Sequence, residues 1–392
     1  MGRLRRTSKI CFVALFLVGS IFPMNEVGAA SVKLAFIAPV SGPNASQGMG
    51  LTNAFDLAIK EANKSGKFPY KIEMMGLDDA SDPAVAFSAA MKAVSDKNVV
   101  AGVGHWNSSC ALATIHAFHA YKVPFIVCAA VSPKITEFNY PEITRTHPIL
   151  IQENTPLIEW IMGEIGYKTF SIVADTTDYG QTGARDWEAQ VKKRGGKILS
   201  VDNFPVGTTD FRPILTKIKG LNPDCIYAST VVMEGALIRT QMVKLGLDLG
   251  LTAIDGLCDD KFNEIAGAEA EGTLITGPGV DLEDLGRGPA FIKAYEAQKY
   301  REPMGATGIF AYESANIVLE ALKQVGPKDK VALAKAIRGI KYDGILGTTT
   351  FDENGQTTLG TVRLLVSQDG KWVKWNESKY KKGERKLPKP KQ

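Results

Sequence analysis

The sequence is poor in the residues and motifs that metal centres and catalytic sites require. It contains 5 cysteines and 4 histidines, and neither a CxxC pair nor an H-E-x-x-H motif occurs. The nucleotide-binding motifs GxxxxGK[ST] and GxGxxG after a strand are absent, and so is the GxSxG turn of α/β hydrolases. We therefore predict a protein that is not an enzyme and that uses no metal ion and no cofactor.

Long apolar runs are also scarce, and the one that occurs lies near the N-terminus. The run from Ile10 to Phe22 follows a basic segment and precedes the small residues 27–30. It is too short to span a bilayer, and this order is typical of a secretory signal peptide. Because Cys11 stands at the start of the run rather than after it, a lipid anchor is not expected. We predict a signal peptide over residues 1–30 and a mature protein in the periplasm.

A strong excess of one charge is absent as well. Lys and Arg number 46 and Asp and Glu 42, which gives a net charge of +4. The leader carries +3 of this charge and the segment 379–392 carries +6, so the remainder is slightly acidic. The composition therefore gives no sign of a nucleic-acid-binding face. We predict that 379–392 is a basic disordered tail.

Four cysteines remain after cleavage of the leader, and their state stays open at this point. An oxidising compartment permits disulfides, but four cysteines allow three pairings and the sequence selects none of them. Buried free thiols are the alternative. The residues concerned are Cys110, Cys128, Cys225 and Cys258.

The remaining chain, about 360 residues long, exceeds what one hydrophobic core usually holds, so two domains are expected. Apolar runs of strand length alternate with segments of helical periodicity, which is typical of doubly wound α/β domains with parallel sheets. The strands are expected at 32–39, 70–77, 98–103, 123–128, 170–174, from 197, 224–228 and 251–255. After residue 289 the pattern predicts helices over 290–300, 310–324 and 330–337, then short strands over 345–351, 361–366 and 371–375.

Three loops follow strands of the first domain and should meet at one edge of its sheet, where ligands bind in such folds. They are 41–50, 104–109 and 129–133. In the second loop Ser108 and Ser109 stand where a helix begins, so their hydroxyl groups and the unpaired N–H groups of the first turn form an anion site. Trp106 precedes them in the same loop. This edge is therefore the predicted binding face.

Two other polar pairs have structural explanations. His116 and His119 lie three residues apart on one expected helix, but no local carboxylate or third histidine accompanies them, so we interpret them as surface or packing residues. Asp78 and Asp79 end an expected strand, and we interpret them as a solvated strand end that caps the following turn.

The ordered motifs resemble the type I periplasmic binding proteins of ABC importers, near the leucine/isoleucine/valine-binding proteins. They are Ser41-Gly42-Pro43, 78–83, 104–109, Asp178-Tyr179-Gly180 and 265–272. The resemblance implies two lobes joined by three hinge crossovers, with the ligand between them. Lobe I would comprise 31–148 and 279–358, and lobe II 149–278 and 359–378.

The resemblance also implies roles for individual residues. Ser108 would bind a ligand carboxylate, with backbone groups at Ala130 contributing; Tyr179 would close over the ligand and Asp255 would pair with an ammonium group. Val131 and Val231 replace a threonine and a tyrosine of the family, Asp255 replaces a glutamate, and a family disulfide is lost at Ser81 and Asn107. The full candidate set is Gln47, Trp106, Asn107, Ser108, Ala130, Val131, Tyr179, Val231 and Asp255.

We therefore expect a monomeric solute receptor that binds a small carboxylate and delivers it to a membrane ABC permease. A branched-chain or other aliphatic amino acid is the first candidate. An aromatic or other non-amino-acid carboxylate or amide is the alternative ligand, because Trp106, Val131 and Val231 make the expected site less polar. A ligand-sensing module for a signalling partner is the alternative class of function.

Overall fold

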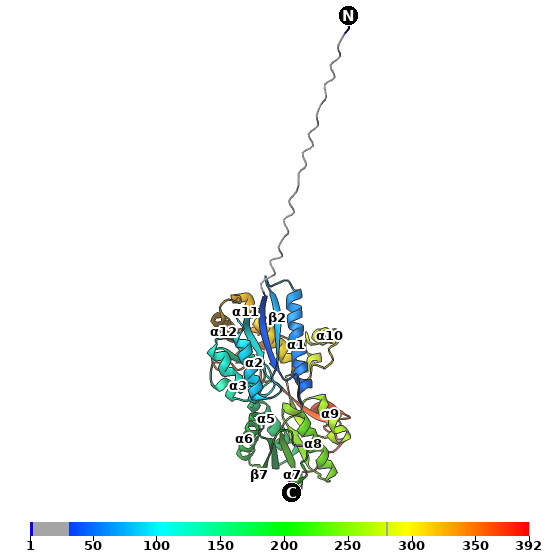
Figure 1. Cartoon of the computed structure of the whole chain (residues 1–392). Coiled ribbons are helices and arrows are strands. Elements are labelled where there is room, and N and C mark those ends of the chain that lie inside the picture. The colour runs from blue at the N-terminus through cyan, green and yellow to red at the C-terminus, as the bar shows by residue number, and fades with distance from the viewer. Residues whose placement is uncertain (3–30, 280, 392) are drawn as a thin grey trace.

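The computed structural model describes residues 1–2, 31–279 and 281–391. These residues form two stacked lobes, with the N-terminal sheet in lobe I and the C-terminus at the far end of lobe II (Figure 1). The predicted signal peptide lies outside the described residues apart from Met1 and Gly2. In the described ranges no helix has the length and apolar character needed to cross a bilayer.

Lobe I is built on a five-stranded sheet in the order β2-β1-β3-β4-β5, and every pairing is parallel. Its inner strands are buried on both faces, as their continuous apolar runs predict. The strands are β1 (Ser31–Ala38), β2 (Lys71–Asp78), β3 (Val99–Gly104), β4 (Phe125–Val127) and β5 (Ile143–Arg145).

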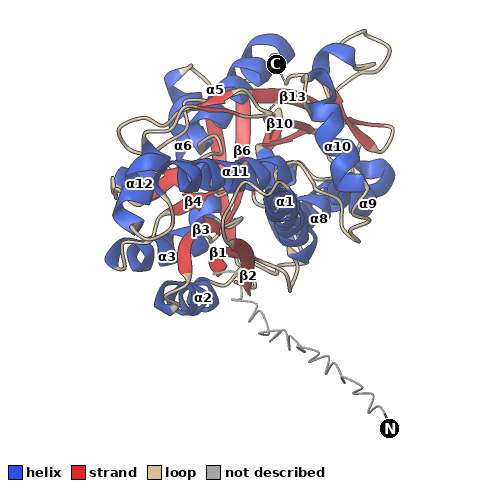
Figure 2. Ribbon diagram, turned by 90° about the horizontal axis from the view of Figure 1, so that it is seen from above, coloured by secondary structure: helices blue, strands red, loops and turns tan. Residues whose placement is uncertain are grey.

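Helices cover both faces of this sheet, and some of them come from the late part of the chain (Figure 2). Among them, α11 packs along α1 and closes one face with its apolar side. The helices are α1 (Ala45–Lys64), α2 (Pro83–Ser95), α3 (Ser108–Ala120), α4 (Lys134–Glu137), α10 (Gly288–Glu296), α11 (Gly308–Val325) and α12 (Lys330–Arg338).

Helix α1 begins earlier than expected, because two glycines that suggested a loop lie inside it. A Cβ atom on Gly48 would lie 1.7 Å from the carbonyl oxygen of Pro39, and one on Gly50 would lie 2.6 Å from that of Pro303. The glycines therefore permit close approach of neighbouring backbone rather than a flexible loop. As a result Gln47 lies in the first turn of a helix.

Lobe II is built on a seven-stranded sheet in the order β14-β13-β10-β9-β8-β6-β7. The five strands β6 to β10 pair in parallel, whereas β13 and β14 add an antiparallel hairpin at one edge. The strands are β6 (Thr169–Asp175), β7 (Lys197–Phe204), β8 (Cys225–Ser229), β9 (Gly250–Ala253), β10 (Leu274–Pro278), β13 (Val362–Gln368) and β14 (Lys371–Lys374). The expected strand 345–351 is mostly irregular and contributes only β12 (Thr348–Thr349), paired with β11 (Tyr342–Asp343).

The helices of lobe II follow the same alternation. Helix α5 ends in a π-helical turn (Ile161–Ile165), and short 3-10 helices follow β9, α9, β10 and β14. The longer helices are α5 (Leu150–Trp160), α6 (Asp178–Lys193), α7 (Arg212–Leu221), α8 (Val232–Lys244) and α9 (Asp260–Ala266). The 3-10 helices of lobe II are Asp255–Leu257, Gly267–Ala270 and Trp375–Glu377, whereas Leu282–Asp284 packs with α10 of lobe I.

The chain passes between the lobes three times, after β5, after β10 and before β13. Each lobe has its own buried clusters: two clusters pack the sheet of lobe I and two pack the sheet of lobe II. This is the two-lobed α/β architecture with parallel-sheet cores that the sequence predicts. The cores are largely separate, although Val131 of lobe I belongs to a cluster of lobe II.

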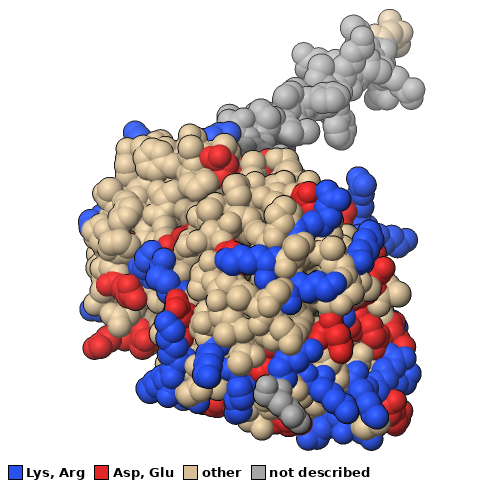
Figure 3. Space-filling view, turned by 90° about the horizontal axis from the view of Figure 1, so that it is seen from below, with Lys and Arg blue, Asp and Glu red and all other residues tan. Residues whose placement is uncertain are grey.

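The segment 379–391 differs from the expected disordered tail, because it packs along lobe II. The Tyr380 hydroxyl group donates to Glu271 at 2.7 Å, and the Tyr167 hydroxyl group donates to the carbonyl oxygen of Pro388 at 2.7 Å. Arg385 also pairs with Asp369 at 2.6 Å. Figure 3 shows basic side chains, with acidic ones among them, around this end of the lobe. Composition suggested disorder, but acids and aromatic rings of lobe II bind the segment.

Candidate functional site

A cavity of about 430 Å³ lies between the lobes, at the carboxyl ends of strands from both sheets. Seven of the nine candidate residues line it. They are Trp106, Asn107, Ser108 and Val131 from lobe I and Tyr179, Val231 and Asp255 from lobe II. The two separated groups therefore meet around one space, as a ligand held between two lobes requires.

The lobe I side of the cavity is the N-terminal turn of α3. Ser108 is the first residue of the helix, and its Oγ accepts a hydrogen bond from the backbone N–H of Ser132 at 3.3 Å. The N–H groups of a first helical turn have no partner within the helix and carry the positive end of its dipole. The Oδ1 atom of Asn107 is buried and has no hydrogen-bond partner among the described residues. This turn can therefore bind a carboxylate and also accept one hydrogen bond.

The neighbouring turn contributes side chains rather than the backbone groups expected of Ala130. The backbone N–H of Ala130 donates to the carbonyl oxygen of His105 at 3.0 Å, and the carbonyl oxygen of Ala130 accepts from Arg145 at 3.1 Å. Both backbone groups are thus engaged inside lobe I, and among the described residues Ala129 and Val131, not Ala130, line the cavity. The buried guanidinium of Arg145 also donates to the carbonyl oxygen of Ser132, which fixes the turn.

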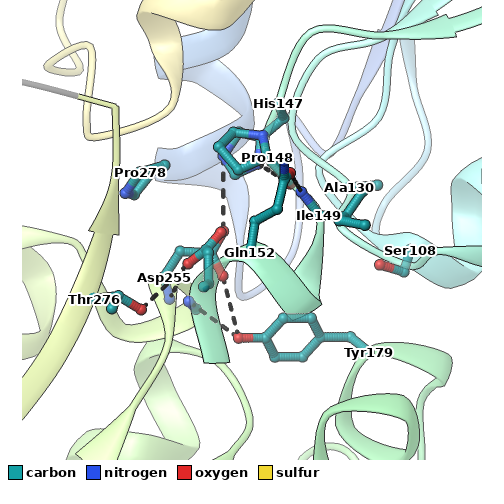
Figure 4. Close-up of polar contacts among 12 residues, drawn as sticks. Ser108, Ala130, His147, Pro148, Ile149, Gln152, Tyr179, Asp255, Thr276 and Pro278 are labelled. Atoms are coloured by element: carbon teal, nitrogen blue, oxygen red, sulfur yellow. Dashed lines mark hydrogen bonds and ion pairs between the residues drawn. The ribbon is translucent and has the colours of Figure 1, made fainter. Parts of the chain in front are cut away.

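Lobe II presents Tyr179 and Asp255 to the cavity (Figure 4). The Tyr179 hydroxyl group accepts from the backbone N–H of Gly256 at 3.1 Å and donates to Asp255 Oδ1 at 3.4 Å. Burial raises the pKa of Asp255 to about 7. Asp255 thus has little support for its negative charge from the protein, which leaves it available to a cationic group.

Two residues behind Asp255 were not among the candidates. Glu153 lies in α5 and is fully buried, and its Oε2 accepts from the backbone N–H of Asp255 at 3.1 Å. Burial, together with the charge of Asp255, raises the pKa of Glu153 well above its usual value. His147 is also fully buried, and its Nε2 lies 3.8 Å from Asp255 Oδ2. Burial lowers the pKa of His147 to about 3.

A signal for Glu153 does exist in the sequence. The buried residues of α5 include Leu150, Leu157 and Ile158, and Glu153 shares their helical stripe. A charged residue among apolar positions at this spacing indicates a buried polar group. Nothing in the local sequence indicates that its partners come from the turn after β9. Of the described residues, His147, Glu153 and Asp255 also form a group whose geometry suits a metal ion.

Gln47 does not line the cavity but bridges the two lobes elsewhere. Its Nε2 donates to Asp259 Oδ2 at 3.1 Å, which joins α1 to the start of α9. A second bridge joins Lys134 to Asp178 at 2.6 Å, and the N–H of Asp178 donates to Ser109 Oγ at 3.1 Å. The lobes are therefore in direct polar contact at two separate places.

The remaining polar pairs behave in different ways. His116 and His119 contact separate partners, Tyr140 at 2.9 Å and Glu142 at 2.6 Å, as surface residues do. Asp78 caps the turn as expected, whereas Asp79 is fully buried and bonds His105 Nδ1 at 2.7 Å. The interpretation of Asp79 as solvated is thus wrong, because it is buried inside lobe I and hydrogen bonded to His105.

The four cysteines in the described part of the chain are free and buried. Their four positions are divided between the lobes: Cys110 and Cys128 lie in lobe I, and Cys225 and Cys258 in lobe II. This is the second of the two states that the sequence left open.

The charged residues that line the cavity are all acidic. Four of the residues that line it are acidic, namely Asp82, Asp175, Glu234 and Asp255. Among the described lining residues none is Lys, Arg or His. The wall between them is apolar at Trp106, Val131, Val206 and Val231. The cavity can therefore bind a compact, partly apolar molecule that carries a carboxylate at the α3 end and a cation near Asp255.

Comparison with known proteins gives a family and several relatives. The sequence pattern of the periplasmic binding protein family matches residues 31–371. A leucine-, isoleucine-, valine-, threonine- and alanine-binding protein of Pseudomonas aeruginosa is 28% identical over 90% of this chain and 93% of its own. A leucine-binding protein of Thermotoga maritima has a TM-score of 0.80 at 25% identity, covering 88% and 97% of the two chains. A solute-binding protein of Rhodopseudomonas palustris BisB5, solved with 3,4-dihydroxybenzoic acid, has a TM-score of 0.76 at 25% identity, covering 88% and 95%.

Proposed function

The chain belongs to the periplasmic binding protein family, and we propose that it is a monomeric periplasmic receptor that delivers an amino acid to an ABC permease. A branched-chain or other aliphatic amino acid is the proposed ligand. The proposal rests on the cavity between the lobes, in which Ser108 and the first turn of α3 lie opposite Asp255. In this arrangement the α-carboxylate binds at Ser108 and the α-ammonium pairs with Asp255.

The acidic wall supports an amino acid over a simple anion. A carboxylate ligand without a cationic group meets acidic residues and no basic side chain among the described lining residues. A zwitterion places a positive charge beside Asp255 and thereby favours its ionised form, which burial otherwise disfavours. The apolar residues between the two ends suit an aliphatic side chain.

An aromatic carboxylate is the second candidate ligand. Trp106, Val131 and Val231 form an apolar wall, and the resemblance to the family implies a threonine and a tyrosine where the two valines stand. The protein of Rhodopseudomonas palustris BisB5 in the comparison was solved with an aromatic acid. A protonated Asp255 donates a hydrogen bond to such a ligand instead of pairing with a cation.

A thermal-shift screen separates the two ligands, since a molecule that binds only the native state raises Tm by mass action. We expect stabilisation by leucine, isoleucine or valine and less by benzoate. The matched ligand pair is leucine and 2-hydroxyisocaproate, which differ at the ammonium group. The matched variants are Asp255→Asn and the surface change Asp210→Asn, whose partner is Arg212. Equal binding of leucine and its hydroxy analogue, or leucine binding undiminished in Asp255→Asn, contradicts the ammonium role.

A further inference from the structure

Three metal-binding side chains meet beneath the ligand cavity, and each comes from a different part of the chain. His147 lies in the first crossing between the lobes, Glu153 in α5 and Asp255 in the turn after β9. Their donor atoms all lie within 4.8 Å of one another. His147 and Glu153 are fully buried, and of the three only Asp255 lines the cavity.

The hydrogen bond of His147 determines which nitrogen carries its proton. Nδ1 lies 2.9 Å from the carbonyl oxygen of Pro148, which can only accept, so Nδ1 is the donor. Nε2 therefore presents a lone pair, and it has no hydrogen-bond partner among the described residues. An Nδ1–H group bonded to a backbone carbonyl, with a free Nε2, is the usual arrangement of histidines that bind metal ions.

The two carboxyl groups beside His147 have few partners, and Asp255 Oδ1 accepts a long hydrogen bond of 3.4 Å from Tyr179. Glu153 Oε2 accepts from the N–H of Asp255 at 3.1 Å and from Thr276 Oγ1 at 3.4 Å, whereas Oε1 has no partner among the described residues. Among those residues, no Lys or Arg forms an ion pair with Glu153 or Asp255. Two buried carboxyl groups and an imidazole lone pair that face one another must share a proton or hold a cation between them, because uncompensated charge is costly to bury.

We propose that His147, Glu153 and Asp255 form a binding site for a divalent transition-metal ion of the Zn²⁺ type. One imidazole and two carboxylates suit Zn²⁺ or Mn²⁺ better than Ca²⁺ or Mg²⁺, which prefer oxygen ligands alone. An ion about 2.0–2.2 Å from each donor spans the 3.8 Å between His147 Nε2 and Asp255 Oδ2. The ion would then keep one coordination position open on the side of Asp255, toward the cavity.

The metal ion and the proposed ligand would share Asp255. A cation at this carboxylate repels an α-ammonium group, so Zn²⁺ is expected to weaken amino-acid binding competitively. This competition rests on the proposed function, whereas metal binding itself does not. Metal binding and amino-acid binding are therefore measured separately.

The test uses the mature, tag-free chain after treatment with a chelator. Titration with Zn²⁺ by calorimetry should give one bound ion per chain. Co²⁺ should give the visible absorption that is typical of an ion with a low coordination number. Glu153→Gln and His147→Gln should each weaken Zn²⁺ binding by at least about tenfold, the lower end expected even for outer-shell changes. His119→Gln, which changes a histidine paired with Glu142, is the control and should bind as the wild type does.

The outcomes separate the two proposals. Absence of stoichiometric Zn²⁺ or Co²⁺ binding to the wild type overturns the metal site whether or not leucine binds, and needs no variant that folds. Metal binding of wild-type strength in Glu153→Gln also overturns it, because the ion then lies elsewhere. Metal binding with no leucine binding at all leaves the metal site standing and contradicts only the proposed function.

Discussion

Lys134 of lobe I and Asp178 of lobe II form an ion pair of 2.6 Å across the boundary between the lobes. Asp178 is the first residue of α6, and its backbone N–H also donates to Ser109 of α3. The negative charge thus lies at a helix N-terminus and pairs with a lysine on the opposite lobe, which stabilises the contact between the lobes. The pair can form only when the lobes meet.

Removal of this pair should speed release of the ligand. Lys134 is about half exposed, so Lys134→Ala should cost about 0.2–1 kcal/mol, or about 1.5- to 5-fold in the dissociation rate. Stopped-flow measurement of dissociation at low and high salt tests this, and the effect should shrink at high salt. Lys192→Ala removes a pair with Glu188 inside α6 and should leave the rate unchanged. An equal effect of both variants contradicts a role in closure.

The α/β architecture, and the edge of the sheet at which the cavity lies, could be predicted from the sequence. Continuous apolar strands and amphipathic helices are local patterns, and parallel strands place the loops after them at one edge. The place of Ser108 in the cavity wall could be predicted for the same reason, since it stands at a strand-to-helix junction. These properties need no knowledge of distant contacts.

The residues that were missed depend on contacts between distant segments. Glu153 matters because the turn after β9 brings Asp255 against α5, and Ala130 is unavailable because Arg145 and His105 engage its backbone. The C-terminal segment is ordered because Glu271 and Asp369 lie where its cations pass. Composition describes a segment alone and carries no information about what it packs against.

Loss of the Ser108 hydroxyl group should weaken ligand binding. Ser108→Ala removes the hydrogen bond that we propose to the ligand carboxylate, worth about 1–3 kcal/mol, which is about 5- to 150-fold in Kd. Calorimetric titration with the ligand identified in the screen measures it. Ser88→Ala, which changes an exposed serine bonded within α2, is the matched control. Unchanged affinity in Ser108→Ala would place the carboxylate elsewhere in the cavity.

Truncation after Ser378 should destabilise lobe II without changing ligand affinity. The removed segment includes Tyr380, and the loss of a large buried aromatic side chain costs about 3–5 kcal/mol. Its partners Glu271, Asp369 and Asp224 do not line the ligand cavity. Urea denaturation and ligand titration together test this. Lys382→Ala, an exposed change in the same segment, should alter neither quantity, and an unchanged free energy of unfolding after truncation would mean that these contacts contribute nothing.

Glu313 of α11 should make the stability of lobe I depend on pH. Its side chain is fully buried, its Oε1 accepts from the backbone N–H of Ile345 at 3.0 Å, and burial raises its pKa to about 7. Below pH 4.5, the pKa of Glu313 in the unfolded chain, its carboxyl group is protonated in both the folded and the unfolded chain, so it does not lower the free energy of unfolding. As the pH rises from 4.5 through 7, the unfolded state ionises first, and folding loses up to about 3 kcal/mol.

Glu313→Gln keeps the size of the side chain and removes its charge, so it should abolish this part of the pH dependence. We expect the ligand-free variant to match the wild type at pH 5 and to be more stable at pH 8, because only the wild type then buries a carboxylate. Thermal or urea unfolding at both pH values measures the difference between the two proteins, in which the contributions of other groups cancel. Glu320→Gln on the exposed face of the same helix should show no such difference. A variant that loses the same stability as the wild type between pH 5 and 8 would show that Glu313 ionises as easily in the folded chain as in the unfolded one.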